Sequence, residues 1–151
     1  IFNPSGMFSS TIYDRTNFKD LVLPAQGYEN KTPWEDVYLN GVVGDKGVYS
    51  TTEDLLKFDR ALKENIFISD SLKKLAFSTM NSERKGNKNY GYGVRLKEHE
   101  KYGKIVYHTG WWKGFRSYFI KVMDKNQTII VLNNVKRGRF LNIDRLIELI
   151  N

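Results

Sequence analysis

Four short runs rich in Val, Ile and Tyr follow one another in the second half of the chain and constrain the fold more than any other feature. They cover residues 90–96, 104–108, 116–123 and 128–133, with Gly, Asp, Asn and Lys between them. Such runs between turn residues are typical of β-strands. Because the connections are short, we expect an antiparallel meander, with a hairpin turn at residues 124–127.

The segments on either side of these runs carry helical patterns. Hydroxyl side chains at Ser50 and Thr51 precede carboxylates by three positions, which is typical of a helix N-terminus, and apolar residues then recur at helical spacing. The patterns predict helices over residues 52–63, from Ser69 or Asp70 onward, and over 140–150. Helices, then strands, then a helix indicate an α+β fold, an antiparallel β-sheet flanked by helices.

Composition excludes several classes of protein. A chain of 151 residues with 40% hydrophobic residues predicts one domain with its own core. The absence of Cys removes thiol, disulfide and Cys-zinc chemistry, and the two histidines, His99 and His108, do not favour a metal site, so we expect no metal and no cofactor. No apolar run approaches the roughly 18 residues that a transmembrane segment needs.

The segment His108-Thr109-Gly110-Trp111 combines groups that a catalytic site can use. A titratable ring, a hydroxyl and a glycine stand in succession at the expected end of a strand. Glycine lets another backbone approach closely because it has no Cβ. The same residues also fit a hairpin in which His108 and Thr109 only cap a turn, so this short motif leaves both interpretations open.

Four segments occur in an informative order along the chain. They are Pro4-Ser5-Gly6-Met7, the nine residues from Gly47 to Leu55, Tyr90-Gly91-Tyr92-Gly93, and His108-Thr109-Gly110. Together they resemble the serine β-lactamase and penicillin-binding-protein-like superfamily, in which His-x-Gly is a variant of the Lys-Thr-Gly triad. The resemblance covers nearly the whole chain and extends to class C β-lactamases, D-aminopeptidases, related esterases and low-molecular-weight penicillin-binding proteins.

The resemblance implies a serine acyl hydrolase that acts on a peptide, a β-lactam or an ester through an acyl-enzyme. The family's Ser-x-x-Lys nucleophile motif and Tyr-x-Asn base motif are absent from the matching places, which would lie upstream of Pro4. We therefore expect residues 1–151 to be a single C-terminal portion of the domain, partnered by an N-terminal portion and inactive alone. The chain begins at Ile1 and its first Met is Met7, so it looks cropped or processed.

The resemblance also implies roles for individual residues and a location. The Trp111 N–H would be one donor to the oxyanion, and His108 would replace the family's Lys, so both are candidate catalytic residues. Thr109 would hydrogen-bond a substrate carboxylate or its equivalent, and Gly110 is a candidate for substrate binding. An imidazole is mostly neutral at pH 7, unlike Lys, and this favours a peptidase or esterase over an efficient β-lactamase. Family members commonly work outside the cytoplasm, which favours a periplasmic or extracellular location.

A second interpretation follows from charge. The net charge of +7 combines −3 over residues 1–60 with +10 over residues 61–151, which hold 18 Lys and Arg against eight Asp and Glu. A basic sheet rich in aromatic residues could bind nucleic acid or another polyanion by stacking and phosphate contacts. The aromatic candidates are Trp111, Trp112, Phe115, Tyr118 and Phe119. The sequence contains no known nucleic-acid motif, so we expect no nucleic-acid partner, and an inert scaffold is a third possibility.

Overall fold

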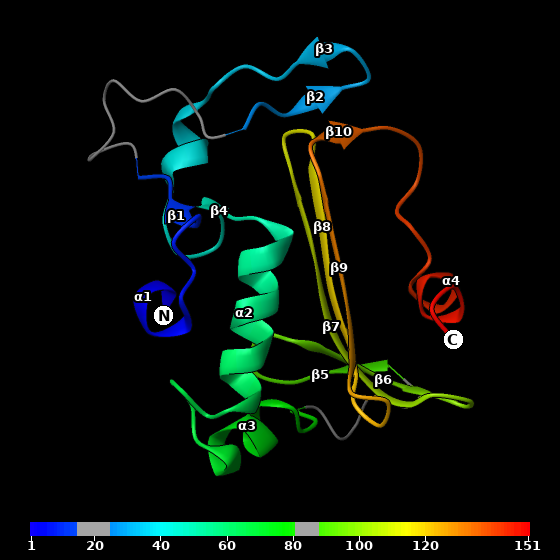
Figure 1. The fold of residues 1–151 in the computed structure, drawn as a ribbon. Helices are drawn as coiled ribbons and strands as arrows, with labels where there is room; N and C mark the ends of the chain where they lie inside the picture. The colour runs from blue at the N-terminus through cyan, green and yellow to red at the C-terminus, as the bar shows by residue number, and fades with distance from the viewer. Residues whose placement is uncertain (15–24, 81–87) are drawn as a thin grey trace.

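The chain folds around one antiparallel sheet with a helix on each face (Figure 1). The structure is a computed structural model that describes residues 1–14, 25–80 and 88–151. Its elements are α1 (Phe2–Ser5), β1 (Thr11–Ile12), β2 (Tyr28–Glu29), β3 (Thr32–Pro33), the 3-10 helix η1 (Tyr38–Gly41), β4 (Val48–Tyr49), α2 (Thr52–Lys63), α3 (Asp70–Ala76), β5 (Lys88–Tyr90), β6 (Arg95–His99), β7 (Gly103–Trp112), β8 (Phe115–Val122), β9 (Gln127–Asn133), β10 (Val135–Lys136) and α4 (Ile143–Glu148).

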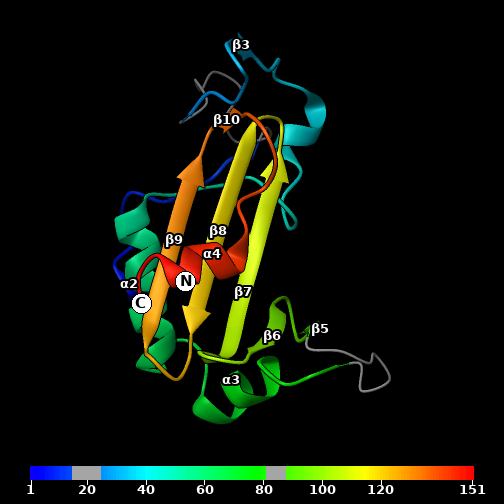
Figure 2. The ribbon, with the colours of Figure 1, turned by 90° about the vertical axis from the view of Figure 1, so that its right-hand side faces the viewer.

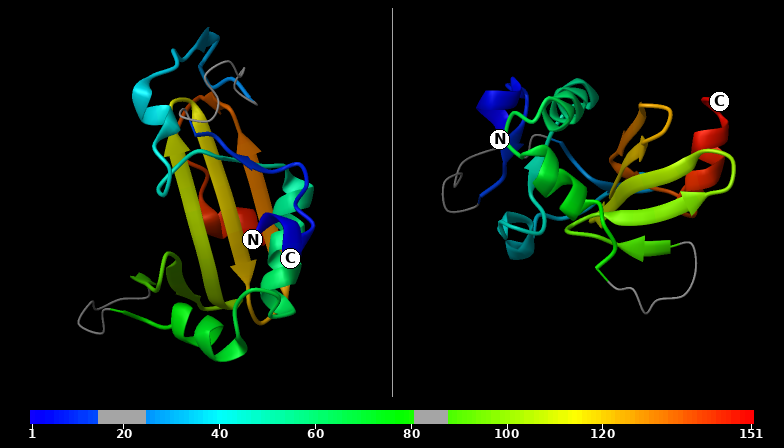
Figure 3. Two further views of the ribbon diagram at one scale, coloured as in Figure 1. Left: turned by 90° about the vertical axis from the view of Figure 1, so that its left-hand side faces the viewer. Right: turned by 90° about the horizontal axis from the view of Figure 1, so that it is seen from below.

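The main sheet has five strands in the order β5-β6-β7-β8-β9, and all of its neighbours are antiparallel. This confirms the predicted meander. Helix α2 lies against one face and α4 crosses the other (Figures 2 and 3). Two small sheets, β1-β4 and β10-β2-β3, complete the strand pairing of the described residues. The predicted α+β fold is therefore confirmed.

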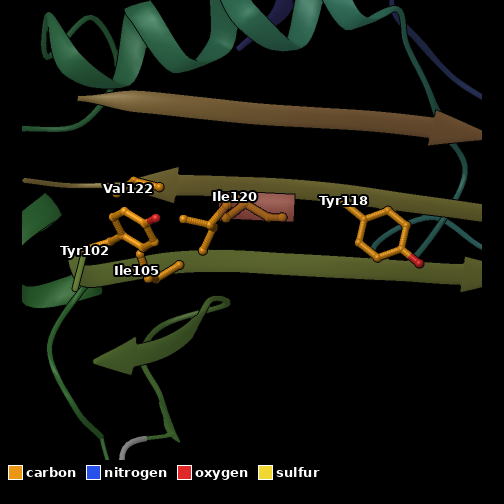
Figure 4. Close-up of a cluster of buried hydrophobic side chains, with 6 residues drawn as sticks. Tyr102, Ile105, Tyr118, Ile120 and Val122 are labelled. Atoms are coloured by element: carbon orange, nitrogen blue, oxygen red, sulfur yellow. The ribbon is translucent and has the colours of Figure 1, made fainter. Parts of the chain in front are cut away.

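The hydrophobic core lies between the sheet and α4 (Figure 4). Ile105 of β7 stands opposite Val122 of β8, and both are fully buried together with Ile120. Side chains alternate between faces along a strand, so every second residue of these strands reaches the same layer. Ile147 of α4 closes the layer from the other side and is also fully buried.

The opposite face of the sheet is tied to α2 by an ion pair. The Lys121 Nζ atom of β8 lies 2.5 Å from the Asp59 Oδ1 atom of α2, and each residue is only 8% exposed. The Thr128 hydroxyl donates to the other oxygen of Asp59 at 3.0 Å. Phe58 of α2 packs edge-on against Phe119 of β8. Residues that share a face with Phe119 therefore face α2.

Helix α2 begins as predicted, and its first turn also binds the N-terminal segment of the chain. The Thr51 hydroxyl accepts the Asp54 N–H at 3.1 Å, which confirms the cap. The Asp54 carboxylate is 1% exposed and accepts from the Ser9 N–H and the Ser10 hydroxyl, both at 2.8 Å. The adjacent ammonium of Lys57, followed by these hydrogen bonds, lowers the pKa of Asp54. Asp54 thus fastens the N-terminal segment to α2.

Two predicted elements differ from the structure. Residues 90–96 are not one strand, because β5 ends at Tyr90 and the chain turns through residues 91–94 into β6, with Gly93 at a φ of 72°. The last helix begins at Ile143 rather than 140, because the Asn142 side chain caps its first turn. The predicted start of α3 and the turn between β8 and β9 are confirmed, with Asn126 of that turn at a φ of 50°.

Candidate functional site

The His-Thr-Gly-Trp segment lies inside β7, along an open part of its edge. Strand β6 pairs with β7 only from Gly103 to Tyr107, whereas β8 pairs with β7 as far as Trp112. The sequence had suggested that this segment lies at the end of a strand, but in the structure it lies within β7. Residues 108–112 have a neighbouring strand on one side only within the described structure. Such an edge presents backbone N–H and C=O groups that another chain or a ligand can bind.

His108 is exposed on this edge and is held by a neighbouring hairpin. Its Nε2 atom lies 3.3 Å from the Tyr90 hydroxyl, and the two rings meet edge to face with centroids 6.4 Å apart. Partial desolvation, and after it the positive charge of Arg95, lower the pKa of His108 below its ordinary value of 6.5. A hydrogen bond with the Thr109 backbone acts in the opposite direction. The imidazole is therefore neutral at pH 7.

Gly110 makes room for a hydroxyl from the neighbouring strand. Ser117 of β8 stands directly opposite Gly110, and a Cβ on Gly110 would lie 2.3 Å from the Ser117 Oγ atom. Any other residue would have to displace this hydroxyl. The close approach that the sequence predicted at Gly110 is thus made by a side chain, not by another backbone.

An open cavity of about 430 Å³ lies beside the far end of β7. Gly110 and Trp111 line it, whereas His108 and Thr109 do not. Other parts of its wall come from residues far away in sequence, including Trp34, Asn40, Tyr49, Ser50 and Phe115. Side-chain alternation places His108 and Gly110 on the α2 face and Thr109 and Trp111 on the other. The four predicted residues are therefore consecutive along one edge but divided between its two faces.

Aromatic rings and ammonium groups form the rim of the cavity. The Trp112 Nε1–H donates to the Asn40 side-chain oxygen at 2.7 Å, and the Lys46 ammonium lies 4.6 Å from the Trp112 ring centroid. Lys113 lies 4.8 Å from the Trp34 ring in the same way. The sequence analysis missed Asn40 and Lys46. They belong to an irregular segment without periodicity, and only the folded chain brings them to β7.

One tetrapeptide of the chain has the spacing of a Ser-x-x-Lys nucleophile motif but lacks its geometry. It runs from Ser71 to Lys74 in α3. The Ser71 hydroxyl lies 3.0 Å from the Ser69 hydroxyl, and the Lys74 ammonium lies 2.9 Å from an oxygen of Asp70. The Ser71 hydroxyl and the Lys74 ammonium therefore contact other residues, not each other. A second match, residues 82–85, lies outside the described residues.

The aromatic residues of the polyanion interpretation do not form a stacking platform. Tyr118 is buried in the core, and Phe119 packs against α2. Phe115 meets Tyr49 edge to face, and Trp112 is bonded to η1. Trp111 alone of the five is largely exposed, at 54%. The structure thus uses four of the five rings for packing or hydrogen bonding.

Two kinds of feature are absent from residues 1–14, 25–80 and 88–151. No cluster of three or more His, Cys, Asp or Glu side chains there is arranged to hold a metal ion. No helix in the described ranges has the length and apolar character that crossing a bilayer requires.

Comparison with known proteins identifies the family. The Beta-lactamase family model matches residues 1–150, and the chain belongs to this family. It is 33% identical to Penicillin-binding protein 4* of Bacillus subtilis (strain 168), over 89% of this chain and 33% of that protein. The chain therefore spans about one third of the length of this relative.

Two solved structures share the fold. A penicillin-binding protein from Bacillus halodurans superposes with a TM-score of 0.72 at 22% identity, over 91% of this chain and 43% of that one. An octameric penicillin-binding protein homologue from Pyrococcus abyssi gives a TM-score of 0.71 at 23% identity, over 90% and 32%. The predicted membership of a β-lactamase and penicillin-binding-protein-like superfamily is thus confirmed.

Proposed function

We propose that this chain forms one wall of the active site of a serine acyl hydrolase that works through an acyl-enzyme. In this proposal residues 1–151 are the C-terminal portion of the domain, and the serine nucleophile belongs to an N-terminal portion of the same protein. The observation that carries the proposal is the open edge of β7, which presents His108 to Trp111 beside a cavity. The family match supports the reaction class.

The backbone of this edge suits stabilisation of an oxyanion. Pairing with β8 on one side holds β7 extended through Trp112, so its outer N–H groups are fixed before substrate arrives. The Trp111 N–H would be one donor to the tetrahedral intermediate, and the N–H of the serine would be the other. One such donor is worth about 2.7–4 kcal/mol of transition-state stabilisation.

His108 would orient a hydroxyl or assist a proton transfer. It is neutral at pH 7, exposed, and has a nitrogen with a lone pair, as general base catalysis requires. A neutral ring holds a substrate carboxylate less firmly than Lys does. This favours a peptide or an ester over a β-lactam as the substrate.

The remaining candidates would bind the substrate. Gly110 exposes backbone at the edge of the cavity, where the acyl part of a substrate would lie against Trp111 and Phe115. Thr109 faces the side of the sheet away from His108, so its hydroxyl would reach a substrate carboxylate around the edge of the strand. The two side chains would thus contact different parts of one ligand.

Replacing His108 by Ala in the complete protein tests this proposal. We expect kcat/KM for a peptide or ester substrate to fall at least about 100-fold, the usual contribution of a proton-transfer group. His99→Gln is the matched control, because His99 packs on Tyr102 next to the first residue of β7, away from the cavity. Unchanged kinetics in His108→Ala would remove His108 from the active site.

A further inference from the structure

Tyr90 approaches His108 from a hairpin that is firmly anchored. The Met80 N–H donates to the Tyr90 carbonyl at 3.0 Å, and the Gly91 N–H donates to the Val94 carbonyl at 2.8 Å. A Cβ on Gly91 would lie 2.2 Å from the Ala76 carbonyl oxygen, so the turn is packed directly against the end of α3. The phenol ring is 42% exposed, but its backbone is fixed.

The surroundings of His108 leave one nitrogen for the Tyr90 hydroxyl. The titratable groups described beside the ring are Tyr90 on β5 and Arg95 on β6, while β8 presents Phe119 opposite it. In the 3.3 Å contact between Tyr90 and Nε2, the phenol O–H is the stronger hydrogen-bond donor and the imidazole nitrogen is the stronger acceptor. A neutral imidazole carries only one proton. The nitrogen bonded to Tyr90 is then the acceptor.

We infer that Tyr90 is a positioning residue for His108. The Tyr90 O–H donates to Nε2 and thereby holds the imidazole in the tautomer with its proton on Nδ1, so that Nε2 is kept as the ring's hydrogen-bond acceptor. At 3.3 Å the bond is long, and a reacting hydroxyl could replace the phenol at Nε2. The catalytic consequence rests on the proposed function, whereas the tautomer does not.

The first test measures the tautomer without any substrate. The complete protein is labelled with ¹⁵N-histidine, and the His108 signal is identified as the one lost in His108→Ala. Above pH 7, ring ¹⁵N shifts should show Nδ1 protonated and Nε2 bare. Tyr90→Phe removes only the hydroxyl and should produce the Nε2–H tautomer. Tyr92→Phe is the matched control, because Tyr92 lies two residues away with an exposed ring, and it should leave the spectrum unchanged.

Two results would overturn the inference at this level. One is an Nε2–H tautomer in the parent protein, and the other is an unchanged tautomer in Tyr90→Phe. Both measurements are made without activity. They therefore stand apart from the proposed function.

The second test measures turnover of the complete protein. In metal sites, a partner that orients a functional histidine is worth about 10–100-fold. For an imidazole oriented in the same way we expect kcat of Tyr90→Phe to fall by about tenfold with KM little changed. The pH limb due to His108 should move upward, because the phenol no longer stabilises the neutral ring. Unchanged kcat in Tyr90→Phe, with His108→Ala inactive, would overturn the positioning role. Unchanged turnover in His108→Ala would overturn the proposed function instead.

Discussion

At the scale of single residues, the position of His108 combines exposure with a positive neighbour. Partial desolvation lowers the pKa of His108 most, and the Arg95 charge lowers it further because it disfavours the imidazolium. The unfolded chain therefore takes up this proton first, and stability is lost as the pH falls below about 6.5. The structure thus keeps the ring neutral through the range in which an ordinary histidine begins to ionise.

Replacing Arg95 by Gln tests this electrostatic effect. The pKa of His108 should rise toward its ordinary value, because the repulsion of the imidazolium is removed. The measurement is an NMR titration of the His108 ring. Lys101→Gln removes the same charge in the turn that precedes β7 and should leave the titration unchanged. An unaltered pKa in Arg95→Gln would contradict the account.

The sequence singled out four candidate residues of the edge but not the residues that contact them. His108, Thr109, Gly110 and Trp111 are recognisable because they are consecutive. Tyr90 stands out in the sequence only as part of the Tyr-Gly-Tyr-Gly segment, and nothing near it marks it as a partner of His108. In the structure the His99 ring packs on Tyr102 with an angle of 40° between the ring planes, and its side chain is 16% exposed. Such partners depend on strand register, which no local pattern specifies.

At the scale of elements, the turn between β7 and β8 shows how the site is shaped. Gly114 has a φ of 90°, and a Cβ there would lie 2.5 Å from the Tyr28 N atom and 2.6 Å from its carbonyl oxygen. The turn therefore packs against β2 through glycine backbone. This contact holds the irregular segment that forms the cavity wall next to the end of β7.

Substituting Ala at Gly114 should destabilise the protein strongly. Strain at positive φ and the backbone clash together should lower the free energy of unfolding by about 3 kcal/mol. Gly138→Ala is the control, because Gly138 has a φ of 65° but no atom within 4 Å of its Cβ position, and it should cost about 1 kcal/mol. Urea denaturation measures both. Equal losses in the two variants would show that the contact with Tyr28 is not needed.

The predictability of the elements follows from how local their causes are. Helix α2 and strands β7, β8 and β9 were predicted because capping, helical spacing and β-branched runs are local. Residues 25–50 carry no such period. Their positions depend on individual contacts with residues far away in sequence. Examples are the hydrogen bond between Trp112 and Asn40 and the close approach of Gly27 to the Lys113 carbonyl oxygen.

At the scale of the whole molecule, several of the basic side chains are used in contacts within the fold. The guanidinium of Arg116 is 8% exposed and donates to the backbone carbonyls of residues 137–139, stacked on Phe140. Lys121 and Lys97 are paired with Asp59 and Asp144. These cations stabilise the fold, which favours the hydrolase over a polyanion-binding module.

In the proposed function, this chain supplies one side of an acyl-transfer site and another part of the protein supplies the attacking serine. The chain spans about one third of the length of its relative, Penicillin-binding protein 4*. The test therefore uses the complete protein to which this chain belongs. The most direct measurement is peptide mapping by mass spectrometry after labelling that protein with a fluorophosphonate or a fluorescent penicillin. We expect the adduct on a serine outside residues 1–151. An adduct on a serine within them, such as Ser50 or Ser71, would contradict the account.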